Sequence, residues 1–246
     1  MSARRKPKPE PEPKPKPEYG IDGYPYVVGL GAAALLLGVG SLILALRGHA
    51  WIATTLGLVS VLPAAPALLG LRYVLHGKLV HRDRLLGLVA WTGNERVLDV
   101  GTGGGVLLIG AAKRVPAGHA CGIDIWSAKD LSGNTKARVL RNAVLEGVAD
   151  RVDVRDDDAR SMSFEAASFD VVLTMLCLHN IEARQDEALR ELVRVLRPGG
   201  IIVVSDLAGT ARYAEFFRAL GLRAEEGPTE WGTFPFQRIV TAKKPG

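Results

Sequence analysis

Two long uncharged stretches near the N-terminus constrain the fold of this chain more than any other feature. The first runs from Val27 to Leu46 and the second from Ala50 to Leu71, with Arg47 and His49 between them. As a helix rising about 1.5 Å per residue, each would span roughly 30 Å, the thickness of the bilayer hydrocarbon. Two buried soluble helices of this kind would need a large partner domain, which the remaining chain does not supply. We therefore expect a transmembrane hairpin.

Details of both stretches agree with membrane helices. Pro63 and Pro66 lie inside the second stretch, where a membrane helix tolerates proline as a kink. The first stretch is longer than the apolar region of a typical cleavable signal peptide. Small residues in the first stretch offer a close contact between the helices. These are Gly29, Gly31, Gly38 and Gly40.

Basic residues flank the two stretches unequally. Six Lys/Arg precede the first stretch, one lies between the two, and Arg72, Lys78, Arg82 and Arg84 follow the second. Since cytoplasmic segments carry the excess of Lys and Arg, both flanks are predicted cytoplasmic, with the hairpin in the cell (inner) membrane. Within residues 4–18 every second position from Pro7 onward is proline, which predicts a disordered tail over residues 1–23. That tail is either a solvated spacer or a basic strip for anionic lipid headgroups.

The basic excess belongs to the N-terminal region alone. Residues 1–81 hold nine Lys/Arg and four Asp/Glu, whereas residues 82–246 hold 22 of each. The larger part is therefore formally neutral, and the net charge gives no reason to expect nucleic-acid binding. Cys121 and Cys177 both lie in apolar runs, as small core residues of a reducing compartment do, so we expect neither a disulfide nor a metal site.

After residue 77 the chain alternates between apolar runs and helical patterns. The runs lie at Arg96–Val100, Ala120–Ile125, Arg151–Val154, Asp170–Met175 and Ile201–Ser205. The helical patterns lie near His81–Trp91, Val106–Arg114, Thr135–Glu146, Arg184–Leu196 and Ala211–Leu220. Such alternation predicts a doubly wound α/β domain over residues 77–246, with a mostly parallel sheet covered on both faces. Two closing strands are expected at Leu222–Glu226 and Phe236–Lys243, and the membrane hairpin occupies residues 24–76.

A glycine-rich turn follows the first of these runs. Asp99 stands in the run Val97–Val100, and Gly101, Gly103, Gly104 and Gly105 follow within five positions before a helical pattern begins. A strand, a glycine turn and a helix N-terminus bring backbone N–H groups close to a ligand. A dinucleotide-binding turn would have a third glycine at position 106, where this chain has Val106. NAD(P)-dependent reduction is thereby disfavoured.

The pattern Asp99-x-Gly101-x-Gly103-x-Gly105 resembles the first motif of class I S-adenosylmethionine-dependent methyltransferases. Further matches follow in the family's order between Arg82 and Lys244. They are Gly122–Ile125, Asp157–Ala159, Ser168–Leu173, Leu178–Asn180 and Leu189–Gly200. The resemblance implies a Rossmann-like fold whose last strand is antiparallel, and S-adenosylmethionine as cofactor.

The resemblance also implies roles for individual residues. Asp99 would serve the methionine end of the cofactor, Asp124 its ribose and Asp158 the adenine amine. The full set of implied cofactor residues is Asp99, Gly101, Thr102, Gly103, Gly105, Asp124, Ile125, Trp126, Asp158 and Ala159. His179 stands where a base would act, although Asn180 replaces the second histidine of many relatives.

The acceptor remains open at this point. The hairpin favours a small or lipophilic acceptor, such as a quinone or a lipid headgroup, methylated at the cytoplasmic face. Candidates for an apolar substrate wall are Tyr213, Trp231, Phe234 and Phe236. The alternative is a membrane-tethered sensor or scaffold that binds the cofactor without turnover. The oligomeric state is not predicted.

Overall fold

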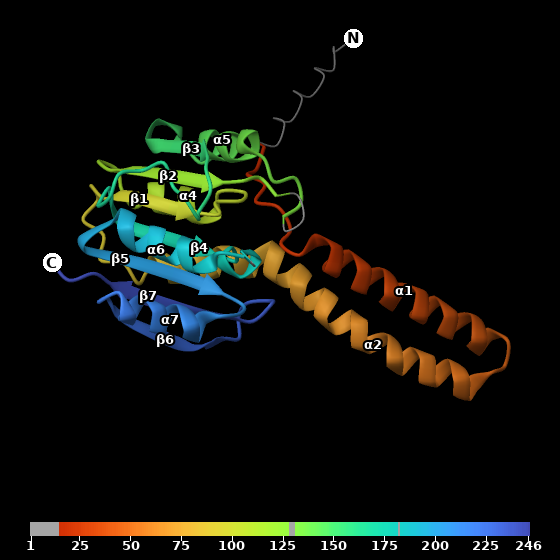
Figure 1. Ribbon diagram of the computed structural model, residues 1–246. Helices are drawn as coiled ribbons and strands as arrows, with labels where there is room; N and C mark the ends of the chain where they lie inside the picture. Colours follow the sequence, from red (N-terminus) through yellow and green to blue (C-terminus); the bar gives the residue numbers. More distant parts are fainter. Residues whose placement is uncertain (1–14, 128–130, 182) are drawn as a thin grey trace, which may run out of the picture.

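The computed structural model describes residues 15–127, 131–181 and 183–246 of the chain. The described chain forms a long helical hairpin joined to an α/β domain (Figure 1). Most of the predicted disordered tail, residues 1–14, lies outside the described residues. The prediction is wrong for Glu18–Asp22, because these residues are hydrogen-bonded to the α/β domain.

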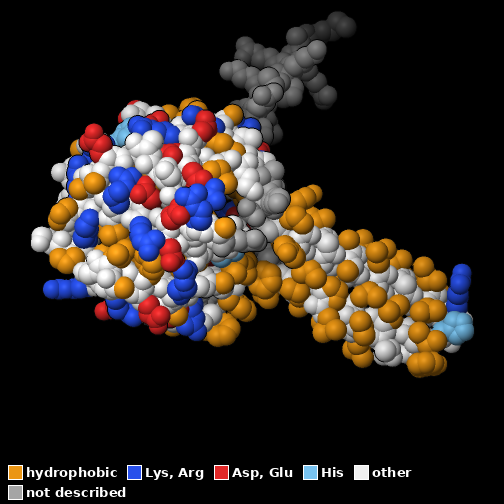
Figure 2. Space-filling model, in the orientation of Figure 1, with side chains coloured by type: hydrophobic (Ala, Val, Ile, Leu, Met, Phe, Trp, Pro, Cys, Tyr) orange, Lys and Arg blue, Asp and Glu red, His pale blue; other side chains and the backbone are white. Residues whose placement is uncertain are grey.

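The hairpin consists of α1 (Tyr24–Leu46) and α2 (Ala50–Arg72). A π-helical turn, Tyr73–Gly77, continues α2 directly into α3 (Lys78–Leu86). Both hairpin helices are long and apolar enough to cross a membrane, and no residue of α1 is buried. Figure 2 shows the hairpin covered with apolar side chains and projecting from a domain whose own surface is rich in charge.

Small residues line only part of the contact between α1 and α2. A methyl group on Gly40 would lie 3.2 Å from Leu56, and one on Gly57 would lie 3.1 Å from the Ser41 hydroxyl. The other three glycines expected at this contact, Gly29, Gly31 and Gly38, have nothing within 4 Å of such a methyl. The expected contact therefore holds for Gly40 alone among the four.

The α/β domain is built on one seven-stranded sheet of order β3-β2-β1-β4-β5-β7-β6. The strands are β1 (Arg96–Val100), β2 (His119–Asp124), β3 (Val152–Asp156), β4 (Phe169–Met175), β5 (Leu196–Asp206), β6 (Arg223–Glu230) and β7 (Gln237–Lys243). The pairs from β3 to β5 are parallel, whereas β7 is antiparallel to both β5 and β6. The predicted fold class is confirmed, including the antiparallel last strand.

Helices cover both faces of the sheet. They are α4 (Val106–Ala112), α5 (Lys136–Leu145), α6 (Gln185–Val195) and α7 (Thr210–Ala219), with short 3-10 turns at Ala149–Arg151 and Leu178–Asn180. One buried core joins α3, α4 and α5 to the sheet, and the other joins α6 and α7 to it. All seven residues of α4 are buried, which fits its almost wholly apolar sequence.

The carboxyl ends of β1, β2, β4 and β5 meet at one edge of the sheet, and this edge faces the hairpin (Figure 1). Side chains at the base of the hairpin bond to the same edge. His81 Nε2 lies 2.7 Å from Ser205 Oγ near the end of β5, and Tyr73 accepts a hydrogen bond from Gln237 at the start of β7. In such sheets ligands bind beyond the carboxyl ends of the strands.

Candidate active site

The glycine-rich turn joins β1 to α4 at this edge. Its fold is tied to β2, because the backbone N–H groups of Gly101 and Thr102 both donate to the Ile123 carbonyl, at 2.9 and 3.0 Å. Gly101 has a φ of 70°, and a side chain there would place its Cβ 2.3 Å from Cys177 Sγ. Glycine is therefore required at this position by both conformation and packing.

Asp99 lies beneath the turn and is almost completely buried, with 2% of its surface exposed. Its Oδ2 accepts hydrogen bonds from the Thr102 hydroxyl at 2.8 Å and from the Leu108 N–H at 3.0 Å. Burial raises the pKa of this carboxyl to about 7, although both hydrogen bonds lower it. The Thr102 side chain therefore holds Asp99 beneath the turn, and its contact with the cofactor stays a prediction.

Asp124 closes β2 beside the turn. Its Oδ2 accepts from the Gly103 N–H at 2.8 Å, and its Oδ1 accepts from the Trp126 N–H at 2.7 Å and the Asn134 amide at 3.2 Å. A carboxylate offers about four acceptor positions, so these three bonds leave room for a further donor. The carboxylate is thus held in a fixed orientation at the mouth of the turn.

Asn134 supplies a second polar group at this position. Its amide oxygen is buried and has no hydrogen-bond partner among the described residues. Next to the open position on Asp124, this unpaired oxygen would accept from a hydroxyl. The two side chains together offer acceptors of the kind that a ribose diol would need, and the cofactor contacts of Asp124 and Gly101–Gly105 stay predictions.

The remaining predicted cofactor residues lie along the same edge. Trp126 has a φ of 60°, and its indole N–H donates to Asp156 at 2.5 Å, while Ile125 is exposed. Ala159 is buried, and the Asp158 carboxylate is held by Arg160 at 2.6 Å. The adenine contact of Asp158 stays a prediction, because this carboxylate is engaged by its own neighbour.

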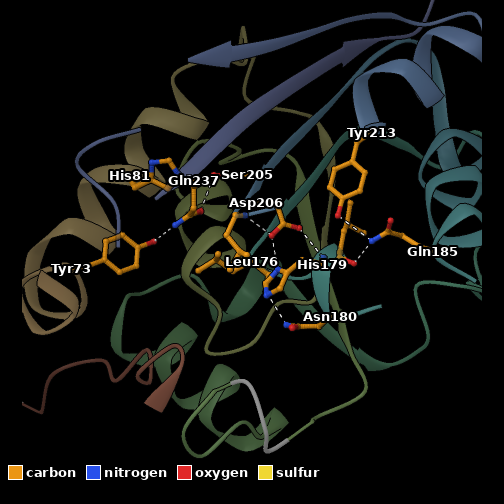
Figure 3. Close-up of polar contacts among 12 residues, drawn as sticks. Tyr73, His81, Leu176, His179, Asn180, Gln185, Ser205, Asp206, Tyr213 and Gln237 are labelled. Carbon is orange, nitrogen blue, oxygen red and sulfur yellow. Dashed lines mark hydrogen bonds and ion pairs between the residues drawn. The ribbon is translucent and has the colours of Figure 1, made fainter. Parts of the chain in front are cut away.

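His179 and Asp206 form a hydrogen-bonded pair across the carboxyl ends of β4 and β5 (Figure 3). The 3-10 turn after β4 carries His179, whose Nδ1 lies 2.5 Å from Asp206 Oδ1 and whose backbone N–H donates to Oδ2 at 3.0 Å. Asp206 ends β5 and is only 1% exposed, whereas the His179 side chain is 20% exposed. The histidine therefore reaches the surface of the edge while its partner stays inside.

A second layer of side chains holds the turn that carries His179. Gln185 donates through Nε2 to the Leu178 carbonyl at 2.6 Å and to the Tyr213 hydroxyl at 3.1 Å (Figure 3). Tyr213 is completely buried, packed in the core beneath α6 and α7. The expectation that Tyr213 forms part of a substrate wall is therefore wrong, because its ring has no accessible surface.

Three other aromatic residues gather in the loop between β6 and β7, residues 231–236. Trp231 and Phe236 meet edge to face at 5.0 Å, and Phe234 lies 6.0 Å from Phe236. A methyl group on Gly70 of α2 would lie 3.5 Å from the Phe234 ring. This aromatic loop therefore packs against the base of the hairpin, at the same end of the domain as His179.

Asp206 and Asn134 were not identified from the sequence. Asp206 directly follows the apolar run Ile201–Ser205, so its place at the carboxyl edge was readable, but its pairing with His179 spans 27 residues and depends on strand order. Asn134 carried no motif. In the described ranges no group of three or more His, Cys, Asp or Glu residues is arranged to hold a metal ion.

Comparison with known proteins agrees with this geometry. A family model described as "Methyltransferase domain" matches residues 98–204. The ubiquinone/menaquinone biosynthesis C-methyltransferase UbiE of Roseobacter denitrificans is 30% identical over 132 residues, which are 52% of this chain and 50% of that protein. The 27-O-demethylrifamycin SV methyltransferase of Amycolatopsis mediterranei is 34% identical over 145 residues, 56% of this chain and 50% of that one.

Solved structures share the fold. A SAM-dependent methyltransferase from Aquifex aeolicus superposes with a TM-score of 0.53 at 18% identity, covering 66% of this chain and 88% of that one. The chain spans about half the length of the two curated relatives described above. Residues 98–204 match the methyltransferase family model, and the glycine turn, the acid that closes β2 and the strand order agree with a class I S-adenosylmethionine-dependent methyltransferase, whose cofactor is S-adenosylmethionine.

Proposed function

We propose that this chain is a membrane-anchored methyltransferase that methylates a small lipophilic acceptor at the cytoplasmic face of the cell membrane. The observation that carries the proposal is the position of the His179–Asp206 pair. It lies at the edge of the sheet that faces the apolar hairpin, beyond the ends of β4 and β5 and near the cofactor turn after β1. An acceptor dissolved in the bilayer would meet this edge first.

Four features support placing the hairpin in a membrane. Its helices expose apolar side chains along their whole length, and it contains no acidic residue between Tyr24 and Arg72. All four of its Ser and Thr side chains bond to backbone carbonyls of the hairpin, as expected where water is absent. Aromatic residues of the 231–236 loop lie at its base, where membrane proteins concentrate Trp and Tyr. Basic residues flank the hairpin on the domain side, which favours a cytoplasmic domain.

S-adenosylmethionine supplies a methyl group already activated on a sulfonium, so the chain's own task is to orient the acceptor and accept its proton. With Nδ1–H donated to Asp206, the Nε2 of His179 is the ring nitrogen available to a substrate. The buried carboxylate fixes this tautomer and stabilises the imidazolium formed on proton transfer. The pair is therefore suited to an acceptor that carries an acidic O–H, N–H or C–H.

The names of two relatives make a small-molecule acceptor such as a quinone chemically reasonable. UbiE is named for ubiquinone and menaquinone biosynthesis, and the Amycolatopsis enzyme for a rifamycin. Both names point to small organic acceptors. We extend that shared property to this chain, and its apolar hairpin adds the expectation that the acceptor is lipophilic.

Transfer of labelled methyl from S-adenosylmethionine into a membrane extract tests the proposal directly. The full chain in its membrane should label an organic-soluble compound, whose identification names the acceptor. His179→Gln should lower the rate by about 10²–10⁴-fold while leaving cofactor affinity unchanged, since general-base catalysis contributes that much. Equal labelling by the wild type and His179→Gln would show that His179 is not the general base.

Carbonate extraction tests the anchor separately. The chain should stay in the membrane pellet, because an integral hairpin resists removal of peripheral contacts. A protein that goes into the supernatant would refute the anchor while leaving the methyl-transfer assay unaffected.

A further inference from the structure

A short segment ahead of the hairpin lies across the cofactor-binding turn. We name Glu18–Asp22 the strap. A Cβ on Gly104 would lie 2.5 Å from the carbonyl oxygen of Tyr19 and 2.9 Å from its Cα. Gly104 is not among the glycines with positive φ, so the turn itself does not require glycine there. The close approach of the strap is what excludes a side chain at this position.

One buried side chain holds the strap and the turn together. Asn142 of α5 is completely buried. Its Oδ1 accepts from the Glu18 N–H at 2.9 Å, and its Nδ2 donates to the Glu18 carbonyl at 2.8 Å and the Gly104 carbonyl at 3.0 Å. The Asn142 amide therefore bonds to the strap and to the cofactor turn at the same time. A displacement of the strap would break these bonds and disturb the turn.

The far end of the strap pairs with the segment that supports Asp124. The Ile21 N–H donates to Ser132 Oγ at 2.9 Å, and the Ser132 N–H donates to the Ile21 carbonyl at 3.3 Å. Two residues further on, Asn134 bonds to the Asp124 carboxylate. The strap is thus connected both to the glycine turn, through Asn142, and to the segment that supports Asp124, through Ser132.

Both legs of the hairpin hold the strap in place. The strap runs through Gly23 into α1, and Lys78 reaches it from the first residue of α3, the continuation of α2. Lys78 is 3% exposed; its Nζ lies 2.6 Å from Asp22 Oδ2 and donates to the carbonyls of Tyr19 at 3.4 Å and Gly20 at 3.2 Å. A buried lysine with these partners fixes the strap at the base of the hairpin.

We propose that the strap forms the outer wall of the cofactor site, with Lys78 and Asn142 as its positioning residues. Docking of the strap and binding of S-adenosylmethionine then stabilise each other, because each orders the same turn and the same Asp124 support. The hairpin thereby contributes to cofactor affinity as well as to location. The inference rests on the proposed function only for the identity of the ligand.

Binding measurements on the full chain in lipid nanodiscs test this inference. The probe is S-adenosylhomocysteine, measured by calorimetry, and hydrogen exchange of the residue 18–22 amides is followed with and without it. In the wild type the ligand should slow exchange of the strap. Gly104→Ala and Lys78→Met should each weaken binding by about tenfold or more and abolish that response. If the strap had a purely structural role, the two substitutions would lower the stability of the protein, and the ligand would not slow hydrogen exchange of the strap in the wild type.

Matched controls are available in the same chain. Gly227→Ala adds a methyl where the nearest atom is 3.5 Å away, and Lys243→Met removes an exposed lysine. Both should bind like the wild type. Wild-type affinity in Gly104→Ala and Lys78→Met would overturn the strap's role alone. No binding of the cofactor or its product by the wild type would overturn the cofactor assignment, and the strap's role with it.

Discussion

The hairpin and the α/β domain are both apolar, yet they use apolar side chains in opposite ways. No residue of α1 is buried, and in α2 only Ala53 and Gly70 are. In α4, all seven residues are buried. The domain buries its apolar groups against itself, whereas the hairpin presents them to its surroundings. Apolar content alone therefore does not say what a segment packs against; the surrounding medium must be inferred from where the polar groups lie.

Polar groups show the same contrast. In the hairpin, hydroxyls turn back to backbone carbonyls, as Ser41 does to Ala53 at 2.7 Å. In the domain, polar side chains converge on one edge of the sheet, where Asp99, Asp124 and Asp206 are each largely buried and hydrogen-bonded. The Ser and Thr hydroxyls of the hairpin bond within the hairpin, whereas the domain brings polar side chains together at one edge of its sheet.

The sharpest way to separate the two regions is to damage the ligand site without touching the hairpin. Asp124→Ala should weaken binding of S-adenosylhomocysteine by about 100–1,000-fold, since it removes an acceptor and leaves the partly buried N–H groups of Gly103 and Trp126 without this partner. Retention of the protein in carbonate-washed membranes should not change. Asp150→Ala, which removes an exposed carboxylate paired with its neighbour Arg151, is the control. Equal affinity of both variants would disprove the ribose assignment.

A charge on the hairpin should do the reverse. Leu36 in α1 is 73% exposed and Val144 in α5 is 66% exposed, so on a water-facing surface arginine would be tolerated at either position. In a bilayer, Leu36→Arg should cost about 3 kcal/mol of insertion free energy and lower the membrane-bound fraction. Val144→Arg should have no such effect. Fractionation after carbonate washing measures both, and identical behaviour would mean that the hairpin does not lie in lipid.

The pH dependence of stability should belong to the domain, because the hairpin has no carboxylate. The folded chain holds the Asp99 proton up to about pH 7, whereas the unfolded chain loses it near pH 4. Folded protein therefore binds more protons in this interval, and this group's contribution to stability falls by roughly 4 kcal/mol as pH rises from 4 to 7 and stays constant above. Asp99→Asn should flatten that part of the profile of thermal unfolding midpoints. If the unfolding midpoint of Asp99→Asn changed with pH as in the wild type, the pH dependence would come from another group.

The smallest effect is expected inside the hairpin. Ser41→Ala removes the bond to the Ala53 carbonyl, and hydrogen bonds between membrane helices average about 0.6 kcal/mol. Reversible unfolding in detergent micelles should show a loss of that size, while cofactor affinity stays the same. A loss of unfolding free energy above about 2 kcal/mol would contradict this estimate. It would mean that the Ser41 bond is stronger than the average hydrogen bond between membrane helices.

Local patterns predicted the elements well. The apolar runs became strands β1 to β5, and the glycine turn lies between β1 and α4 where a cofactor site was expected. These features depend on a few neighbouring residues, which is why the sequence reveals them. The two closing strands were also expected, although β6 and β7 begin and end a few residues from the predicted bounds.

Contacts between distant segments were not predictable. The pairing of Asn142 with Glu18 joins residues 124 positions apart, and Lys78 meets Tyr19 across 59. Neither pair carries a pattern, because each depends on how the hairpin returns to the domain. The aromatic residue Tyr213 shows the converse error. Its side chain suggested a ligand surface, but its helical position turns it into the core, where Gln185 satisfies its hydroxyl.

The uninterrupted passage from α2 to α3 has a mechanical consequence. Residues Ala50–Leu86 form one helix of 37 residues, about 55 Å long, with a π-helical turn and no flexible joint. If the hairpin lies in a membrane as proposed, such a stalk would allow little swivelling, and the reacting edge would keep a constant height and tilt above the bilayer. The enzyme would then search for its acceptor by lateral diffusion in two dimensions. Only molecules that present their reactive atom at that height would be within its reach, whatever the length of the tail below it.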